Sequence, residues 1–236
     1  MFNKPFIGIQ GGTFDPIHIG HLRTALELKE GLGLSEVRLI PARISPHRRE
    51  PFASPQDRLD MLAAALPGNS GLVIDERELR RSGPSFTVDT LISLRAEVGE
   101  TIPLCLLLGM DAFLGLHTWH KPRTILTLAH IVVAHRPGWA PPHSGLMADW
   151  LREYQGGGLA ALTRQPAGIV LTYPVTALDI SASTIRRLIA AGCSPRFLVP
   201  DAVCALIQQR SLYSSNFLAG LRPPPSGGLV KLDNDA

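Results

Sequence analysis

The sequence predicts an α/β fold, a single Rossmann-like, doubly wound domain with a mostly parallel central sheet and a small C-terminal helical part. Short apolar runs alternate along the chain with longer stretches in which apolar residues recur at helical spacing, as expected for strands buried between helices. Gly and Pro separate these segments and mark the turns. A length of 236 residues allows one α/β domain with a well-filled core and is too short for two large ones.

The strands are predicted from the apolar runs. The run at residues 103–108 is the most apolar stretch of the chain, so we expect it to be a central strand. Beyond residue 138 the composition shifts to Pro, Gly and scattered Leu, and we interpret residues 139–165 as a surface insertion or connection with a short helix at 146–154. The predicted strands are residues 6–9, 36–40, 72–74, 103–108, 131–134 and 168–172.

The helices are predicted from their spacing and from residues that cap them. Ser54 and Pro55 are typical of a helix start, and the helix that follows should bury one apolar stripe. Ser85 or Thr87 can cap the helix after the third strand. The stripe comprises Leu59, Leu62, Ala63 and Leu66. The later helices span residues 183–191, capped by residue 179 or 181 and closed by a Gly at 192, and residues 200–210.

Composition excludes some classes of protein. A net charge of +3 is too small to argue for nucleic acid, and we expect no membrane partner because neither a transmembrane run nor a signal-peptide pattern is present. We therefore expect a cytoplasmic protein. Cys105, Cys193 and Cys204 have no Cys-x-x-Cys pairing and fit reduced, buried thiols. Arg outnumbers Lys, which suits phosphate contacts but equally fits a bias in codon composition.

The first motif lies between the first strand and the first helix, at residues 11–21. Its glycines let the backbone approach a ligand, and the start of the following helix favours an anion. His18 and His21 are three residues apart, so their imidazoles should share one helix face, with Gly20 leaving open space between them. A structural turn, with histidines that are ordinary surface or core residues, is the alternative. The pattern is neither Gly-x-Gly-x-x-Gly nor a Gly-Lys-Ser/Thr loop, and it lacks a third zinc ligand.

The second motif lies at the start of the predicted helix at 183–191. Ser183 and Thr184, together with the helix N-terminus, form a predicted anion site, and Arg186 lies one turn inside it.

Polar residues also follow other predicted strands, where ligands bind in open parallel sheets. His47 and Arg48 put cations on a loop and are expected to face phosphate, unless this is only a solvated charged loop. Asp111 can bind a ribose hydroxyl or a metal-bound water, or cap a short helix. Trp119 offers an aromatic plane, although an isolated Trp is usually part of the core. The charged run at 75–81 is most simply a solvated edge.

His18-Ile19-Gly20-His21 resembles the (His/Thr)-x-Gly-His signature of a nucleotidyltransferase superfamily, and residues 180–186 resemble its Ile-Ser-Ser-Thr-x-Ile-Arg pattern. The segments between them resemble those of bacterial nicotinate-nucleotide adenylyltransferases, in order and spacing. The match runs from about residue 6 to about residue 213, which we take as one domain with a helical part at 181–213; residues 214–236 are expected to be a disordered tail. The departures are Ala182 in place of Ser and His120 where an aromatic hydroxyl is common.

The resemblance implies attack of nicotinate mononucleotide on the α-phosphorus of ATP, with Mg²⁺ held mainly through phosphates and water, and the dinucleotide and pyrophosphate as products. The catalytic residues would be His18, His21 and Arg186. The ATP and phosphate contacts would be Gly11, Gly12, Thr13, Phe14, Gly20, Gly109, Asp111, Ser181, Ser183 and Thr184. The mononucleotide contacts would be His47, Arg48, Ser85, Phe86, Thr87, Trp119, His120 and Arg136.

Alternatives remain open at this stage. A class I aminoacyl-tRNA synthetase also carries His-Ile-Gly-His, but this chain has no Lys-Met-Ser-Lys-Ser loop and no room for a tRNA-binding domain. Another adenylyl- or cytidylyltransferase, for instance one acting on nicotinamide mononucleotide, is the main enzymatic alternative. A non-catalytic nucleotide-binding regulator is the other. The sequence does not indicate an oligomeric state and is compatible with a homo-oligomer.

Overall fold

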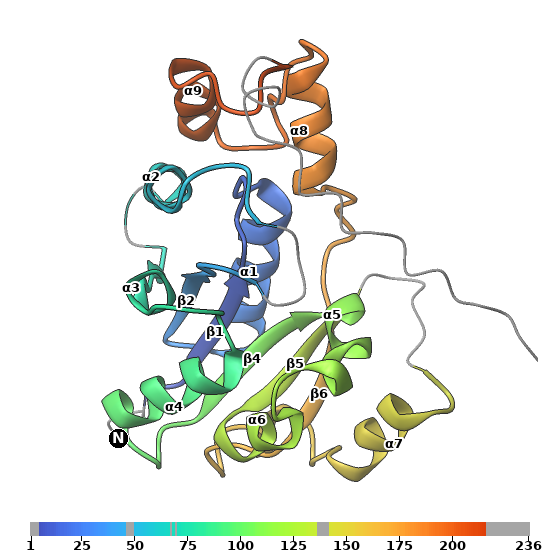
Figure 1. The fold of residues 1–236 in the computed structure, drawn as a ribbon. Helices are drawn as coiled ribbons and strands as arrows, with labels where there is room; N and C mark the ends of the chain where they lie inside the picture. Colours follow the sequence, from blue (N-terminus) through green and yellow to red (C-terminus); the bar gives the residue numbers. More distant parts are fainter. Residues whose placement is uncertain (1–4, 46–49, 67, 69, 136–141, 216–236) are drawn as a thin grey trace, which may run out of the picture.

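The computed structural model describes residues 5–45, 50–66, 68, 70–135 and 142–215, which form a six-stranded sheet between helices (Figure 1). The strand order is β3-β2-β1-β4-β5-β6, and all neighbouring strands are parallel. The chain starts in the middle of the sheet and builds outward to each edge in turn, so the predicted doubly wound fold is confirmed. The strands are β1 (Ile7–Gly12), β2 (Glu36–Pro41), β3 (Leu72–Ile74), β4 (Leu104–Gly109), β5 (His130–His135) and β6 (Val170–Pro174).

Each of the six apolar runs forms a strand, but some strand ends differ from the prediction. β1 continues through Gly11 to Gly12, which pairs with Pro41 of β2, so the glycines belong to the strand end rather than to a turn. β6 begins later than predicted because Gly168 has φ +94°, a conformation that a strand does not accommodate.

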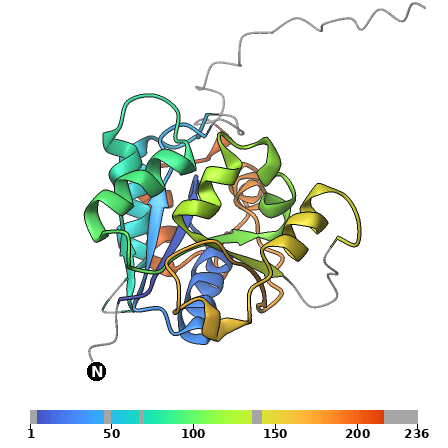
Figure 2. The same ribbon diagram turned by 90° about the horizontal axis from the view of Figure 1, so that it is seen from below.

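Helices cover both faces of the sheet, and each face has its own apolar core. α1 (Ile19–Leu32) lies on one face, whereas α4 (Thr87–Val98) and α6 (Pro122–Leu128) lie on the other (Figure 2). Alternate residues of a strand point to opposite faces, so Leu107 of β4 packs in the core of α1 and Leu106 in the core of α4. The site described below lies at the edge where both cores end.

The remaining elements are α2, several shorter helices and the two helices of the C-terminal part. α8 and α9 lie beyond the carboxyl ends of the strands (Figure 1). Their bounds differ by one residue at each end from the predicted helices. These elements are α2 (Pro55–Ala65), α3 (Arg77–Arg80), α5 (Met110–Leu114), η1 (Leu116–Thr118), α7 (Leu146–Glu153), η2 (Leu159–Ala161), α8 (Ala182–Ala190) and α9 (Asp201–Gln209).

The buried face of α2 differs from the predicted stripe. Ser54 caps this helix as predicted, accepting a hydrogen bond from the Asp57 N–H at 3.0 Å. However, Ala63 is exposed, and the buried face consists of Arg58, Met61, Leu62 and Ala65. A pattern based on apolar residues missed this face because its first member is an arginine. Within this buried face, Nη1 of Arg58 donates to two backbone carbonyls.

The charged run at 75–81 is not simply a solvated edge. Arg77 binds Asp75 at 2.7 Å and Glu97 of α4 at 2.5 Å, and Arg38 of β2 binds the same Glu97 at 2.7 Å. Glu78 is buried. The run therefore ties the β3 end of the sheet to α4, and its alternating charges are largely paired.

The segment predicted as a surface insertion also packs into the protein. Met147 and Trp150 of α7 are buried in the core of α4, and Leu162 is buried in the core of α1. Cys105 and Cys204 are buried free thiols as predicted, but Cys193 is exposed because it lies in the turn after α8.

Among the described residues, no helix combines the length and the apolar character that a membrane span requires. Residues 216–236, which contain most of the predicted tail, lie outside the described part.

Candidate active site

A cavity of about 870 Å³ opens at the carboxyl edge of the sheet, between the ends of β1 and β4 and the start of α8. It is large enough for a dinucleotide-sized ligand. The predicted site residues that line it are Gly11, Gly12, Thr13, Phe14, His18, Gly20, His21, Ser85, Phe86, Thr87, Gly109, Asp111, Trp119, His120, Ser181, Ser183 and Arg186. The predicted residues His47, Arg48 and Arg136 lie outside the described part of the chain.

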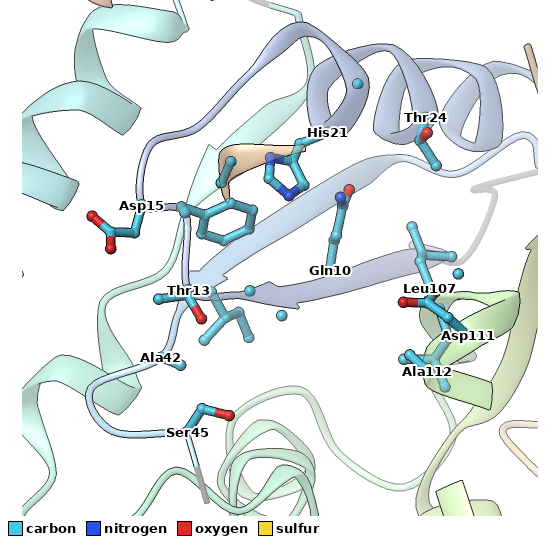
Figure 3. A pocket seen from close by; sticks show the side chains of 18 of the residues that line it. Gln10, Thr13, Asp15, His21, Thr24, Ala42, Ser45, Leu107, Asp111 and Ala112 are labelled. Atoms are coloured by element: carbon cyan, nitrogen blue, oxygen red, sulfur yellow. The ribbon is translucent and has the colours of Figure 1, made fainter. Parts of the chain in front are cut away.

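The two histidines of the first motif lie together at the start of α1. His18 is the N-cap residue, and its Nδ1 accepts a hydrogen bond from the His21 N–H at 3.4 Å. The two imidazoles stack with their ring centres 3.6 Å apart, and His21 meets the edge of Phe14 at 5.1 Å. The predicted shared face is therefore present, and Figure 3 shows His21 pointing from α1 toward the cavity.

The protonation of His18 follows from its burial. Desolvation lowers the pKa of His18 to about 4, so the imidazole is neutral at pH 7. A neutral imidazole carries one N–H, and because Nδ1 accepts the backbone hydrogen bond, the proton lies on Nε2. His18 therefore offers a single fixed donor. An anion that enters the cavity would raise this pKa and strengthen the hydrogen bond.

Two glycines of the motif are required by close packing. A Cβ at Gly12 would lie 2.9 Å from the ring of Phe14, and a Cβ at Gly20 would lie 3.0 Å from Nδ1 of His18. Phe14 itself has φ +50° and is fully buried. The backbone of the turn thus packs closely against the ring of Phe14. The residues of the turn also line the cavity.

The second motif meets the first across the cavity. Ser181, rather than residue 179, caps α8, and its Oγ accepts a hydrogen bond from the Thr184 N–H at 3.2 Å. Ser183 and Arg186 line the cavity, but Thr184 does not. Successive side chains of a helix point about 100° apart, so Thr184 faces away from the direction of Ser183. The Thr184 hydroxyl instead accepts hydrogen bonds from Ser181 at 3.0 Å and Arg187 at 3.1 Å.

The opposite wall of the cavity is built around the start of α4, and here the predicted caps were wrong. The N-cap residue is Phe86, which makes no side-chain cap hydrogen bond. The Ser85 hydroxyl instead accepts a hydrogen bond from the Arg43 N–H at 3.0 Å, and the Ser85 N–H donates to the Ile44 carbonyl at 2.9 Å. Ser85 therefore binds the loop after β2, and no side-chain cap hydrogen bond is present at the N-terminus of α4 among the residues that the structure describes.

Glu78 lies beneath this wall. It accepts a hydrogen bond from the Thr90 hydroxyl at 2.6 Å, and burial raises its pKa, opposed mainly by that hydrogen bond. Sequence reasoning missed Glu78 because its run looked uniformly solvated.

Aromatic rings line the same side. Trp119 is partly buried, with part of its surface packed on the core of α4 and the rest facing the cavity. The His120 ring lies 4.6 Å from the ring of Phe86. Asp111 is exposed in the first turn of α5, at the carboxyl end of β4, and does not form an N-cap, since Gly109 takes that position. An aromatic plane and a carboxylate thus face the same space as the histidines.

Comparisons with known proteins agree with this geometry. A family model described as cytidylyltransferase-like matches residues 9–188. A protein of Aeromonas hydrophila named "Probable nicotinate-nucleotide adenylyltransferase" is 50% identical over 210 residues, covering 89% of this chain and 98% of that protein. A Hahella chejuensis protein of the same name is also 50% identical over 210 residues, covering 89% of this chain and 96% of its own length. This chain belongs to the nicotinate-nucleotide adenylyltransferase family.

The adenylyltransferase resemblance predicted from the two motifs is thus confirmed. The fold agrees as well: the structure titled as Plasmodium falciparum nicotinic acid mononucleotide adenylyltransferase complexed with NaAD matches with a TM-score of 0.67 at 15% identity. That match covers 89% of this chain and 97% of the Plasmodium chain.

In this family member, Asp15 is the residue that sequence reasoning missed most clearly. Its buried carboxylate accepts hydrogen bonds from the N–H groups of Phe52 at 2.7 Å and Ala53 at 3.1 Å, and from the Tyr213 hydroxyl at 2.7 Å. Burial raises the pKa of Tyr213, so its phenol remains a donor. Asp15 therefore joins the first motif, the loop before α2 and the C-terminal part. Its only local signal was an Asp-Pro pair inside the motif.

Arg58 is the second missed residue. It is fully buried, and its Nη1 donates to the carbonyls of Thr13 at 2.8 Å and Ala42 at 2.7 Å. Burial lowers the pKa of Arg58, but a guanidinium titrates so high that it keeps its charge. Arg58 therefore holds together the backbone ends that follow β1 and β2.

Proposed function

We propose that the protein transfers the adenylyl group of ATP to nicotinate mononucleotide and releases nicotinate adenine dinucleotide and pyrophosphate, a step of NAD biosynthesis. One observation carries this proposal: two motifs far apart in sequence, at the start of α1 and the start of α8, line one cavity. A phosphate chain held between them would meet donors from both sides. The similar proteins named for this activity support the same assignment.

The step is an in-line substitution at the α-phosphorus of ATP. An oxygen of the 5′-phosphate forms the new P–O bond, and the bond from the α-phosphorus to the bridging oxygen of the β-phosphate breaks. The electron pair leaves with pyrophosphate. Because the nucleophile is already an anion, no strong general base and no covalent intermediate is needed. The rate comes from alignment and from stabilisation of charge in the transition state.

His18 and His21 are the donors to the α- and β-phosphate region. The neutral His18 presents Nε2–H, and its stacking against His21 holds that donor in place. Fixed donors in a partly buried site require little reorganisation as negative charge develops. Thr13 and the backbone N–H groups of the glycine turn are proposed to bind the bridging oxygens.

The α8 side binds the departing pyrophosphate. Ser183 and Arg186 line the cavity there, at the positive end of the α8 dipole. One nitrogen of Arg186 already binds the Asp15 carbonyl, and a guanidinium carries further N–H donors that can reach phosphate.

The α4 side binds the pyridine nucleotide. Trp119 can stack on the pyridine ring, and the backbone N–H groups at the start of α4 lack a side-chain cap and can bind the pyridine carboxylate. A carboxylate accepts from these donors, whereas the amide of the nicotinamide form also brings hydrogens toward them. We therefore propose the nicotinate form as the substrate, with His47, Arg48 and Arg136, which lie outside the described residues, as further contacts.

Mg²⁺ is proposed to enter with ATP. In the described part of the chain, no group of three or more His, Cys, Asp or Glu residues could hold a metal ion. Asp111 is an exposed carboxylate on the cavity wall, which fits a magnesium ion that keeps most of its waters and is held mainly by phosphate oxygens. Mg²⁺ would neutralise phosphate charge there.

A cytoplasmic location is proposed as well. The cysteines at 105, 193 and 204 are all free thiols, a state that a reducing compartment maintains.

The decisive experiment measures pyrophosphate release from purified protein with ATP and Mg²⁺, offering nicotinate mononucleotide or nicotinamide mononucleotide. A higher kcat/KM for the nicotinate form, with the dinucleotide as product, supports the proposal. A higher kcat/KM for the nicotinamide form would reassign the substrate. Nucleotide binding without pyrophosphate release would instead indicate a regulator.

A further inference from the structure

Gln10 has a buried amide that the proposed chemistry does not use. It lies in β1, directly before Gly11, with 8% of its surface exposed. In the part of the chain that the structure describes, its Oε1 is buried and has no hydrogen-bond partner. Yet Gln10 lines the cavity. Buried polar groups are nearly always paired, so this amide is an exception that needs a reason.

Packing does not supply that reason. Gln10 points to the same face of the sheet as Gly8, since the two are two residues apart, and the three atoms nearest to a Cβ at Gly8 would belong to the apolar side chains of Leu34, Val37 and Leu107. An apolar residue at position 10 would therefore suit this face better than an amide. The position carries a polar group where the local environment of the strand favours a hydrocarbon.

The location of the amide indicates which ligand it meets. In Figure 3 the Gln10 side chain rises from β1 toward α1, where His21 and Thr24 also face the cavity. The start of α4, where the pyridine nucleotide is proposed to bind, packs over the opposite face of the sheet, with Ile9 in its core. Gln10 thus belongs to the side of the cavity that the histidines form, which the proposed function assigns to ATP.

The chemistry of the amide narrows the contact further. Ionised phosphates only accept hydrogen bonds, so a phosphate could take the Nε2 donors of the amide but would leave Oε1 without a partner. A ribose hydroxyl both donates and accepts, and therefore pairs with either end of the amide after a turn about its last bond. We infer that the amide of Gln10 hydrogen-bonds a ribose hydroxyl of ATP. This inference rests on the proposed function.

The test compares Gln10→Leu with the wild type, using ATP, 2′-deoxy-ATP and 3′-deoxy-ATP. We expect the KM for ATP to rise about five- to tenfold, since one hydrogen bond is lost, while the KM for the mononucleotide stays unchanged. For the analogue that lacks the contacted hydroxyl, the KM of the variant should be close to the KM of the wild type, by the logic of a double-mutant cycle. Gln10→Asn, which keeps the amide, should recover part of the loss with ATP.

Unfolding separates this role from a structural one. Gln10→Leu removes a buried oxygen that has no hydrogen-bond partner among the described residues, so its Tm should equal or exceed that of the wild type. Gln10→Met, an unbranched apolar replacement, serves if the leucine variant does not fold. A lower Tm with an unchanged KM for ATP would overturn the inference. An equal rise in the KM for ATP and for both deoxy analogues would overturn it as well. So would a rise in the KM for the mononucleotide in place of the KM for ATP.

Direct binding distinguishes this inference from the proposed function. Calorimetric titration with ATP and Mg²⁺, without the mononucleotide, measures the same contact without turnover. If the wild type binds ATP but forms no dinucleotide, the proposed function fails, while the weaker ATP binding of Gln10→Leu would still support the contact. Equal ATP binding by both proteins would exclude it.

Discussion

Arg186 donates from Nη1 to the backbone carbonyl of Asp15 at 2.5 Å, across 171 positions of sequence. The same guanidinium lies 4.6 Å from the ring centre of Phe52 and 3.9 Å from the carboxylate of Asp15. Arg186 therefore both faces the cavity and attaches α8 to the turn after β1. A change at this position should affect ATP use and the docking of α8 together.

Replacing Arg186 separates charge from geometry. Arg186→Ala removes donors to pyrophosphate and the contact to Asp15, so kcat/KM for ATP should fall by roughly ten- to a hundredfold, as expected for lost hydrogen bonds to a charged group. Arg186→Lys keeps the charge but cannot span both partners, and should recover only part of the loss. Steady-state kinetics with varied ATP measure this. An unaltered kcat/KM for ATP in Arg186→Ala would remove Arg186 from the ATP site.

His18 should matter for turnover more than for substrate affinity. His18→Ala removes the fixed Nε2 donor, so kcat should fall by about a hundredfold or more, while the KM values change much less. His117→Ala is the matched control, because His117 is exposed and does not line this cavity. Wild-type turnover by the His18 variant would exclude a catalytic role for this histidine.

Much of this site could be predicted from the sequence, because the residues within each of the two motifs lie close together along the chain. His18 and His21 share a helix turn, and Ser181 caps the helix that carries Arg186, so spacing alone brought each pair together. The interactions of Asp15 could not be predicted in this way. Its partner Tyr213 lies 198 positions away, and no pattern within either segment connects the two.

The failed predictions share a physical cause. Ser85 is a good cap by residue type, but its hydroxyl is used by the Arg43 N–H of the neighbouring loop. No sequence pattern singled out Arg58, because only the fold brings the carbonyls of Thr13 and Ala42 to it. In both cases a tertiary partner decided what local propensity left open.

Acid should destabilise the protein through His18. Burial lowers the pKa of His18 from 6.5 to about 4. As the pH falls, His18 therefore becomes protonated in the unfolded chain at a higher pH than in the folded protein, which favours unfolding. This contribution to the free energy of unfolding is complete above pH 6.5 and is lost as the pH falls toward 4, by an amount on the order of 3 kcal/mol. His130, whose pKa burial also lowers, acts in the same direction. Urea unfolding between pH 7.5 and 4.5 measures the effect.

The variant His18→Asn provides the comparison for this pH dependence. It keeps a side-chain acceptor at the N-cap but does not titrate, so its stability should depend less steeply on pH than that of the wild type. Identical slopes for the two proteins would show that His18 is not the group responsible.

Arg58 should support the ATP side of the cavity from behind. Arg58→Met keeps most of the buried volume but leaves the carbonyls of Thr13 and Ala42 without their donor. The cost should be about 1–3 kcal/mol for each buried acceptor, and the KM for ATP should rise because the turn at Thr13 is no longer fixed. Arg80→Met is the control, since the side chain of Arg80 is 77% exposed and forms a surface ion pair with Glu76 four residues before it. Urea unfolding and ATP kinetics on both variants measure the difference. Equal stability of the two variants would mean that the guanidinium of Arg58 contributes no more to stability than an exposed guanidinium does.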